Sequence, residues 1–359
     1  MKYDVIIAGA GPAGSMAALV LSRAGKRVLV LEKAQFPRVK VCGYSLNPRS
    51  WSVWKRHGLT ERFMALPHFD LAGFTLEKEG TPVVCHHFRA QRTRTLDRGM
   101  LDAWLADEAQ ASGAEYRFGV AVQNISTTEV HTSVGGFAAP LIIGADGRNS
   151  VVGRLSNLEI HGSLCGRVGW QTFIDLPSLN DHVHMNIFPE GYYGMNRINA
   201  TQATLTMVLF AQAKVTPDQI LARYLPRATS AGWKSLSPIT KTPWKLTDGH
   251  TWLVGDAVRL LEPLTGEGIY SALITGEMAA RNILSIDRVG LEKAMQNYRS
   301  QHRRFYGSRT LINSLVRWSL VDSRRSMRIM SILKLWPTAV SHMVELVQKP
   351  ENPELQLTQ

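Results

Sequence analysis

The strongest constraint on this chain lies in residues 3–32, where an apolar run, a glycine-rich loop, a helix of small residues and a second apolar run follow one another. The loop contains Gly9, Gly11 and Gly14, and the second apolar run ends at Glu32. The order strand, loop, helix and strand is that of a dinucleotide-binding βαβ unit. A glycine-rich turn in an ordinary α/β domain is the alternative, but it would not need the terminal acid. The segment therefore predicts an α/β fold and a site for an ADP-containing cofactor.

Each residue type in this loop has a physical reason to be there. Gly9 permits a tight turn, Gly11 lets the backbone approach a pyrophosphate, and Gly14 lets the helix pack close to the strand. The first N–H groups of the helix and the positive end of its dipole then face the phosphates. Glu32 can accept hydrogen bonds from a ribose diol.

The middle of the chain departs from this α/β pattern. Residues 166–211 alternate between apolar and polar, which predicts a separate antiparallel sheet. A later apolar run, 251–254, leads into Gly255-Asp256 and resembles a further strand of the first domain. We therefore expect a discontinuous cofactor-binding domain of residues 1–68, 95–160 and 236–295, an inserted substrate domain of residues 69–94 and 161–235, and a helical C-terminal segment of residues 296–359.

Composition argues against several other classes of protein. The apolar content of 45% and the charged content of 19% are those of a folded domain. The net charge of +12 comes without zinc-finger spacing, RNA-binding aromatics or basic heptads, so we expect no nucleic-acid partner. Cys42, Cys85 and Cys165 lie far apart, which predicts neither a disulfide framework nor a zinc site and fits a cytoplasmic location. No uncharged apolar run is long enough to predict a membrane-spanning helix.

One later segment extends the ADP site toward a flavin. Asp256 follows the end of a predicted strand, where a carboxylate can accept a ribityl hydroxyl. The loop Gly266-Glu-Gly268 then opens a long helix whose first N–H groups are unpaired. Aimed at the N1/C2=O edge of a flavin, these groups would stabilise the negative charge that forms on reduction.

Three other stretches are weak when each is taken alone. Asp146-Gly147 could be a plain turn, and Arg98 could be a surface arginine. The loop of residues 36–43 carries Arg38 and Lys40, which could meet phosphates or an acidic substrate, although solvated cations are the simpler interpretation of either one.

Together, however, these stretches resemble the three fingerprints of single-component flavoprotein monooxygenases of the p-hydroxybenzoate hydroxylase fold. The matching segments are the N-terminal glycine loop, Asp146-Gly147 with Ser150, and Gly255-Asp256 with Pro263, Gly266 and Gly268. Within that superfamily, residues 36–43 (Phe-Pro-Arg-x-Lys-x-Cys-Gly) are similar to the branch of geranylgeranyl reductases, flavin-dependent halogenases and related hydroxylases. The resemblance covers residues 1–295. It implies a Rossmann-like FAD-binding domain, an antiparallel β-sheet substrate domain and C-terminal helices.

The resemblance also implies roles for individual residues. Glu32 would contact the adenosine ribose, Arg98 the FAD, and Asp256 its ribityl and pyrophosphate side, while Asp146 would serve FAD and help NAD(P)H to interact. No second glycine motif is present for NAD(P)H, as expected if the reductant binds transiently. The residues expected to bind FAD are Gly9, Gly11, Ala13, Gly14, Glu32, Lys33, Arg38, Cys42, Gly43, Arg98, Asp146, Gly147, Gly255, Asp256, Pro263, Gly266, Gly268 and Ile269.

Two departures from the sequence motifs of this family decide how we rank the candidate reactions. Residues 170–177 lack the second tryptophan of the halogenase motif, and residues 195–197 alter the end of the reductase motif. We therefore expect first a NAD(P)H-dependent monooxygenase, acting through a flavin C4a-hydroperoxide on an aromatic or unsaturated small molecule or on an aromatic side chain of a protein partner. A reductase of isoprenoid double bonds is the alternative. A flavin-binding partner protein without turnover is the third hypothesis.

The residues that would touch the substrate are less constrained. Cys42, Tyr44, Tyr192, Tyr193 and Arg197 are the candidates, although tyrosines in sheets more often pack than react.

No metal site is expected from the sequence. His86 and His87 are adjacent on a predicted strand, so their side chains should point to opposite faces and cannot share an ion.

The C-terminal segment is strongly basic. Residues 299–334 carry nine Lys or Arg and one acid, with large apolar residues among them. A basic amphipathic helix of this kind can lie on an anionic membrane. It can also cover the substrate domain with its arginines in solvent, which we favour, so a weak peripheral membrane contact stays an open prediction.

Overall fold

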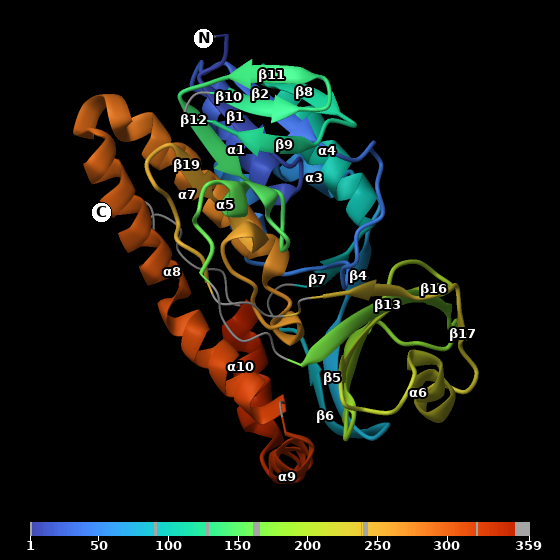
Figure 1. The fold of residues 1–359 in the computed structure, drawn as a ribbon. Helices are drawn as coiled ribbons and strands as arrows, with labels where there is room; N and C mark the ends of the chain where they lie inside the picture. The colour runs from blue at the N-terminus through green and yellow to red at the C-terminus, as the bar shows by residue number, and fades with distance from the viewer. Residues whose placement is uncertain are drawn as a thin grey trace.

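The computed structural model describes residues 2–89, 92–126, 129–160, 166–237, 239, 243–320 and 322–348. Cys165 and residues 349–359 of the predicted C-terminal segment lie outside the described residues. A parallel sheet with helices, a second larger sheet and a run of C-terminal helices along one side make up the molecule (Figure 1). This mixed α/β architecture is the one that the sequence predicts.

The cofactor-binding domain is built on a parallel sheet whose strands come from distant parts of the chain. Within the sheet, Val5 lies beside both Leu141 and Val28, which places β1 at the centre. Every residue of β1 and β2 is buried, as apolar strands covered on both faces should be. In spatial order the described strands are β19 (Thr251–Leu253), β12 (Leu141–Gly144), β1 (Val5–Ala8), β2 (Val28–Glu32) and β8 (Glu115–Phe118).

Different elements cover the two faces of this sheet. One apolar cluster joins it to α1 (Pro12–Arg23), α4 (Arg98–Ala111) and α7 (Gly268–Val289). The other face packs against α5 (Val151–Leu155) and a small antiparallel sheet of β9 (Val122–Ile125), β10 (Glu129–Thr132) and β11 (Gly135–Ala138). Both faces of the sheet are therefore buried, and the loops predicted to bind the cofactor follow the ends of its strands.

Two glycines allow α1 and α7 to approach their neighbours closely. A Cβ on Gly14 would lie 1.9 Å from the carbonyl oxygen of Gly9, and a Cβ on Gly276 would lie 2.1 Å from the oxygen of Ala13. No side chain fits at either distance. This packing places the start of α1 against α7 at Gly276, beside the carboxyl edge of the sheet, where open α/β sheets bind ligands.

The substrate domain is a larger sheet that is mostly antiparallel, as predicted. Its β5 strand, however, lies parallel to β14, with Gly73 beside His182. This parallel pair is possible because β5 and β14 are far apart in the sequence and are not joined by a hairpin. The described order is β17 (Thr229–Ser230), β13 (Arg167–Asp175), β16 (Gln202–Phe210), β15 (Gly191–Arg197), β14 (His182–Phe188), β5 (Gly73–Lys78) and β6 (Thr81–His87), with β18 (Lys234–Leu236) also on β13.

Smaller elements join the two sheets. The helix α6 (Pro217–Tyr224), with a capping box at Thr216, packs in the apolar cluster on one face of the substrate sheet. A short sheet of β3 (Ser45–Leu46), β7 (Thr93–Thr95) and β4 (Phe69–Leu71) lies between the domains. In the chain, α2 (Ser50–Arg56) and α3 (Thr60–Met64) come between β3 and β4. Single 3₁₀ turns at Gly255–Ala257 and Pro263–Thr265 shape the loops before α7.

The last three helices of the described part of the chain are α8 (Leu291–Leu320), α9 (Ser323–Leu333) and α10 (Pro337–Gln348). α8 runs along one side of the molecule (Figure 1), and at the lower end α9 and α10 contact β6, with α9 also contacting β14. Leu320, Met330 and Val340 are buried there against Leu76 and Val84 of the substrate sheet. Among the described residues, no helix combines the length and the apolar character needed to cross a membrane.

Candidate functional site

A cleft of about 250 Å³ lies between the carboxyl edge of the parallel sheet and one face of the substrate sheet. The loops that follow β1, β12 and β19 form one wall, and β13 to β16 form the other. The predicted cofactor residues that line this cleft are Gly11, Ala13, Cys42, Gly43, Arg98, Gly147, Asp256, Pro263, Gly266, Gly268 and Ile269. Residues far apart in the sequence therefore meet at one place.

Two helices turn uncapped N-termini toward this cleft. α1 begins after Gly11 and α7 after Glu267, and neither helix has a side-chain cap or an acid in its first turn. Gly11 and Ala13 line the cleft at one helix end, and Gly268 lines it at the other. Free N–H groups at a helix start need acceptors and favour negative charge. The cleft thus offers two separate places where a bound group could put anionic oxygens.

Glu32 and Arg38 organise the adenosine end of the predicted site. The buried Glu32 carboxylate accepts the N–H groups of Ala10 and Ala34, each at 2.9 Å. Arg38 Nη2 lies 3.7 Å from Glu32 Oε2 and 3.5 Å from the position of a Cβ on Gly11. A guanidinium therefore stands beside the glycine loop, where a pyrophosphate would pass. The side chain of Lys33 is exposed and does not line the cleft.

Four predicted cofactor residues, Gly9, Gly14, Asp146 and Gly255, lie behind the cleft rather than on its wall. Asp146 Oδ2 accepts the N–H groups of Val151 at 2.7 Å and Val152 at 3.0 Å, at the start of α5. Its Oδ1 is buried without a hydrogen-bond partner among the described residues. Gly255 has a φ of +56° and donates its N–H to Thr275 Oγ1 at 2.9 Å. In this structure these residues fix the loops, and the expected FAD contact of Asp146 stays a prediction.

Cys42 lies on the cleft wall in the middle of a hydrogen-bonded group. Its Sγ accepts from Arg98 Nη1 at 3.3 Å and from the backbone N–H of Tyr44 at 3.4 Å. Arg98 Nη2 also donates to Asp102 Oδ1 at 2.9 Å. Burial lowers the pKa of Arg98, but Asp102 and Cys42 raise it more, so the guanidinium stays charged. Lys40 lines the same cleft, and burial together with Arg98 lowers its pKa.

The substrate sheet presents alternate residues of β15 to the cleft. Tyr192, Gly194 and Asn196 line it, whereas Tyr193 and Met195 belong to the apolar cluster on the opposite face. The Tyr192 hydroxyl donates to Glu262 Oε1 at 2.5 Å. Strand periodicity of two explains the division and could have separated the two tyrosines from the sequence alone.

Three of the predicted substrate contacts are therefore corrected. Tyr193 points to the wrong face of β15, and Tyr44 is buried against another ring outside the cleft. Burial raises the pKa of Tyr44 to about 12, so it keeps its proton. Arg197 Nη2 donates to two backbone carbonyls in the loops near the sheet edge. Cys42 and Tyr192 are the candidates that the structure leaves on the cleft wall.

The loop that carries Pro263 and Gly268 is held at both ends by buried ion pairs, which the sequence analysis missed. Before it, Glu262 Oε2 lies 2.8 Å from Arg167 Nη2. After it, Glu267 Oε1 lies 3.0 Å from Arg49 Nη1 and 3.3 Å from Arg309 Nε. Buried carboxylates need such partners, so two acids bracketing a predicted cofactor loop were the available signal.

Comparison with known families gives a direct result. Residues 2–303 match a family model described as FAD binding domain. The chain belongs to this family of FAD-binding proteins. Its cofactor is therefore FAD, and the chain is a flavoprotein oxidoreductase of the kind that the sequence resembles.

Curated relatives of this flavoprotein include lipid and quinone reductases. It is 29% identical over 324 residues to the menaquinone reductase of Mycolicibacterium smegmatis, covering 79% of this chain and 77% of that protein. It is 28% identical over 323 residues to digeranylgeranylglycerophospholipid reductase 1 of Methanopyrus kandleri, covering 78% of this chain and 80% of that protein.

Solved structures with the same fold include a probable FAD-dependent monooxygenase, pqsL, from Pseudomonas aeruginosa, with a TM-score of 0.74 and 20% identity over 90% of this chain and 98% of that one. The myxobacterial chondrochloren halogenase CndH has a TM-score of 0.79 and 19% identity over 99% of this chain and 92% of that one. At these identities the likeness concerns the fold alone.

The cleft of the flavoprotein fits FAD on its own geometry. A Cβ at Gly147, Gly266 or Gly268 would meet nothing within 4 Å, so the backbone leaves room for a flat ring and its chain. The uncapped ends of α1 and α7 supply donors for the pyrophosphate and for a flavin carbonyl. Asp256, Arg98 and Lys40 line the space between them.

A second cavity of about 200 Å³ adjoins the flavin cleft. Ser45, Val183, Leu264 and Gly266 line both spaces, so the two are contiguous. The second cavity lies between the substrate sheet and the C-terminal helices, and although Asn47, Thr93, Ser319 and Ser326 also line it, its walls are predominantly apolar. They include Phe74, Leu76, Phe88, Ile187, Val316, Leu320, Ile329, Met330, Leu333, Val340, Met343 and Val344. We refer to it as the apolar cavity.

Proposed function

We propose that this flavoprotein uses NAD(P)H to reduce a carbon–carbon double bond of an extended apolar substrate, such as an isoprenoid chain. The observation that carries the proposal is the apolar cavity, which shares Val183 and Leu264 with the flavin cleft. A chain lying in that cavity would present one of its double bonds at the cleft. The named activities of the menaquinone and digeranylgeranylglycerophospholipid reductases support this substrate class. The sequence favoured a monooxygenase, but a compact aromatic substrate would not need the additional cavity.

The chain's own residues would do the following work. FAD, when bound, supplies a hydride to one carbon of the double bond. The Cys42 thiol would donate a proton to the other carbon, so that the two hydrogens complete the saturated product. The Arg98 and Tyr44 N–H groups hold the sulfur at the cleft wall during this transfer. The apolar walls keep water away from the reacting carbons.

A second candidate is oxygen-dependent hydroxylation of an aromatic substrate. The specific observation that favours it is the polar pair on the cleft wall, where the Tyr192 hydroxyl donates to the buried Glu262 carboxylate. This pair could orient a phenolic ring beside the flavin. The pqsL and CndH structures share the fold but add no evidence on the reaction.

One assay separates the candidates. NAD(P)H oxidation by the FAD-loaded protein should be measured with and without oxygen, in the presence of menaquinone, geranylgeraniol or simple phenols. The reductase proposal expects substrate-stimulated oxidation and a saturated product under anaerobic conditions. Turnover that requires oxygen and consumes a phenol would overturn it in favour of hydroxylation. FAD binding without stimulated oxidation by any substrate would leave the flavin-binding partner protein as the remaining hypothesis.

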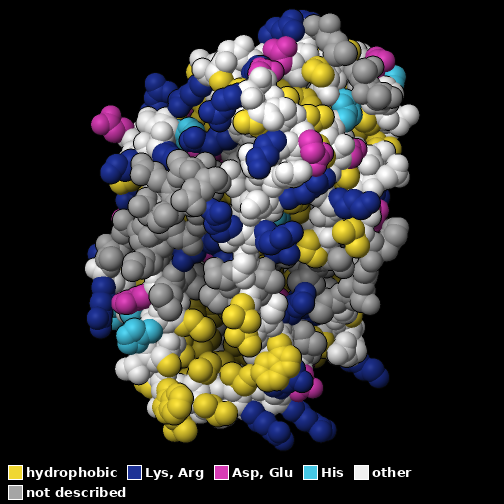
Figure 2. All heavy atoms as spheres, turned by 90° about the vertical axis from the view of Figure 1, so that its left-hand side faces the viewer, with side chains coloured by type: hydrophobic (Ala, Val, Ile, Leu, Met, Phe, Trp, Pro, Cys, Tyr) yellow, Lys and Arg dark blue, Asp and Glu magenta, His cyan; other side chains and the backbone are white. Residues whose placement is uncertain are grey.

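We also propose that the substrate reaches the apolar cavity from an anionic membrane surface. Among the described residues from Leu311 to Met343, seven large apolar side chains are exposed, and three of them are 56% (Trp318), 75% (Leu335) and 68% (Trp336) accessible. Figure 2 shows this patch at the lower end of the molecule, with Lys and Arg side chains around it. We name it the C-terminal apolar patch: Leu311, Leu315, Trp318, Ile332, Leu335, Trp336 and Met343.

Two features favour membrane contact over the alternative, in which the C-terminal helices only pack against the substrate domain. Met343 is exposed in the C-terminal apolar patch and also lines the apolar cavity, so the patch and the cavity meet. Arg317, Arg324 and Arg328 are exposed beside it, and such charges attract anionic headgroups. Exposed tryptophans flanked by cations are typical of the membrane interface.

A further inference from the structure

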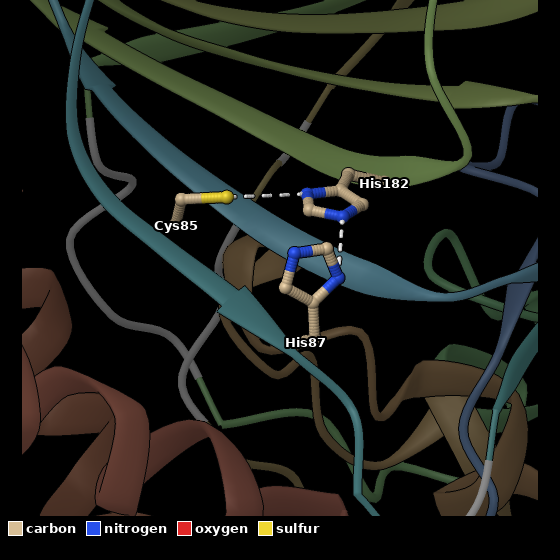
Figure 3. Close-up of side chains that lie close together, drawn as sticks. All are labelled: Cys85, His87 and His182. Atoms are coloured by element: carbon tan, nitrogen blue, oxygen red, sulfur yellow. Dashed lines mark hydrogen bonds between the residues drawn. The ribbon is translucent and has the colours of Figure 1, made fainter.

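The substrate sheet carries a cluster of potential metal ligands on the face of β6 that points away from the apolar cavity. Val84 and His86 of β6 are buried, whereas Cys85 and His87 alternate with them on the exposed side. The buried His182, at the start of β14, reaches the same place across β5. Figure 3 shows the three side chains of Cys85, His87 and His182 converging from two strands.

The spacing of these side chains suits a small metal ion. The distance from His182 Nε2 to His87 Nδ1 is 3.3 Å, and the distance from His182 Nδ1 to Cys85 Sγ is 3.8 Å. One ligand atom from each residue can be chosen so that all three lie within 4.8 Å of one another. Tetrahedral zinc, with Zn–S of about 2.3 Å and Zn–N of about 2.0–2.1 Å, places neighbouring ligand atoms roughly 3.3–3.6 Å apart. Adjustments of the order of 1 Å in two exposed side chains would therefore form the site.

The surroundings of His182 prepare it to bind a metal. Its Nδ1 lies 2.9 Å from Thr75 Oγ1, and when Nδ1 carries the proton, Nε2, which already faces His87 Nδ1 at 3.3 Å, is the nitrogen that can bind an ion. Gly73 makes room for the ring, because a Cβ there would lie 2.4 Å from His182 Nε2.

We propose that Cys85, His87 and His182 bind one zinc ion, with a solvent molecule as the fourth ligand. A thiolate with two imidazoles is a donor set that zinc prefers, and three protein ligands leave one open position. His86 is excluded, as its adjacency to His87 predicts, because it faces α10, with Nε2 3.6 Å from Glu345 Oε1. The expectation of no metal site rested on the adjacency of His86 and His87 and on the spacing of the cysteines, whereas the β5–β14 pairing brings in His182.

A bound ion would join the edge strand β6 to β14 across β5. The opposite side of β6 and β14 carries Val84 and Ile187, which pack with the C-terminal helices beside the apolar cavity. The ion would thus stiffen the outer end of one wall of the apolar cavity. This role is independent of the reaction proposed for the flavin cleft.

The test uses the full chain, FAD-loaded and free of any added histidine tag. Zinc content after dialysis against zinc and then buffer should be one equivalent per chain. Cobalt(II) titration should give a thiolate-to-cobalt absorption band that Cys85→Ser abolishes, while His87→Ala should reduce bound zinc by at least tenfold. His86→Ala is the matched control on the same strand and should bind zinc as the unaltered chain does. Retained flavin absorbance shows that each variant is folded.

Several outcomes would overturn the proposal. These are no retained zinc, a cobalt band that persists in Cys85→Ser, or equal loss of zinc in His86→Ala. Exclusive binding of copper(I) would also overturn the zinc assignment. Because His182 is buried, His182→Gln could fail to fold, and the exposed Cys85 and His87 variants therefore carry the test.

Discussion

The Arg98 guanidinium donates a hydrogen bond to the sulfur of Cys42 across 3.3 Å on the wall of the flavin cleft. Arg98 is itself fixed, because its Nη2 donates to the buried Asp102 at 2.9 Å. The sulfur therefore has a defined position rather than a free rotation. A weak acid held at a fixed point beside a bound flavin is what proton donation to a substrate carbon requires.

Replacing Cys42 should affect turnover far more than cofactor binding. General acid catalysis contributes roughly 10²–10⁴-fold to rate, so Cys42→Ala should lower kcat for the double-bond substrate by about 10²-fold. Val39→Ala, an exposed position in the same loop, is the matched control and should leave kcat unchanged. Steady-state kinetics and the flavin spectrum measure both effects. Normal turnover in Cys42→Ala would remove this residue from the mechanism.

The apolar cavity should set the length of the substrate. Leu333 of α9 lines it, and a larger ring there would fill the space. Overpacking costs about 1–3 kcal/mol, so Leu333→Trp should raise KM for a long isoprenoid by roughly tenfold or more, with little effect on a short one. Lys334→Trp, at the exposed neighbouring position, should raise the KM of neither the long nor the short isoprenoid. An equal effect of Leu333→Trp on short and long substrates would show that the chain does not lie in this cavity.

The contact between α1 and α7 should tolerate no side chain at Gly276. A Cβ there would lie 2.1 Å from the Ala13 oxygen, at the helix start expected to bind the pyrophosphate. We expect Gly276→Ala to destabilise the protein by about 1–3 kcal/mol and to weaken FAD binding. Gly307→Ala is the control, because a Cβ at that helical position meets nothing within 4 Å. Denaturant unfolding and FAD titration measure the two quantities, and equal behaviour of the variants would refute the packing argument.

Glu277 should make stability depend on acid pH. Burial raises its pKa, but His57, 3.1 Å away, and the hydrogen-bonded Arg56 lower it to about 2, from the ordinary 4.5. A carboxyl whose folded pKa is depressed stabilises the protein above its unfolded pKa and loses this contribution as pH falls through the folded value. The free energy of unfolding should therefore fall between pH 4.5 and about 2.

The variant Glu277→Gln isolates this effect. Breaking a buried ion pair costs roughly 3–5 kcal/mol, so the variant should be less stable by about 3 kcal/mol near neutral pH. Its stability should also change less than that of the unaltered chain across the acid window. Glu292→Gln, at an exposed carboxylate, should change neither quantity. A parallel pH dependence in Glu277→Gln and the unaltered chain would assign the acid sensitivity to other groups.

Much of the fold could be predicted because the relevant signals are local. Gly9, Gly11 and Gly14 lie within six residues of one another, and the strand that ends at Glu32 follows the next helix. The alternation in residues 202–210 likewise predicts a strand from its own composition. Such patterns record the geometry of one element, and no knowledge of its neighbours is needed.

The parts that were missed depend on which strands become neighbours. Cys85 and His182 lie 97 positions apart, and only the parallel pairing of β5 with β14 brings them together. Arg167 and Glu262 are 95 positions apart and meet in the buried interior because the loop before α7 packs against the start of β13. Tyr193 is a different case. Its strand was predicted, but the alternation of side chains along a strand, which places Tyr192 and Tyr193 on opposite faces, was not applied.

The C-terminal apolar patch should bind anionic vesicles through both charge and burial. Attraction to an anionic surface contributes about 1 kcal/mol per nearby Lys or Arg and is screened by salt, whereas insertion of Trp336 and Leu335 is not. We therefore expect co-sedimentation with phosphatidylglycerol vesicles at low salt, weaker binding at high salt, and little binding to phosphatidylcholine vesicles. Leu335→Ser with Trp336→Ser should weaken binding at either salt concentration.

A matched control distinguishes this docking from nonspecific adsorption to the vesicles. Val134 is also exposed, at 59%, but lies in the turn between β10 and β11, beside the parallel sheet and far from α9 in Figure 1. Val134→Ser should therefore bind vesicles as the unaltered chain does. The absence of sedimentation with anionic vesicles at low salt would contradict membrane docking. It would leave the reductase proposal intact, because activity on a detergent-dispersed isoprenoid depends on the apolar cavity and not on the patch.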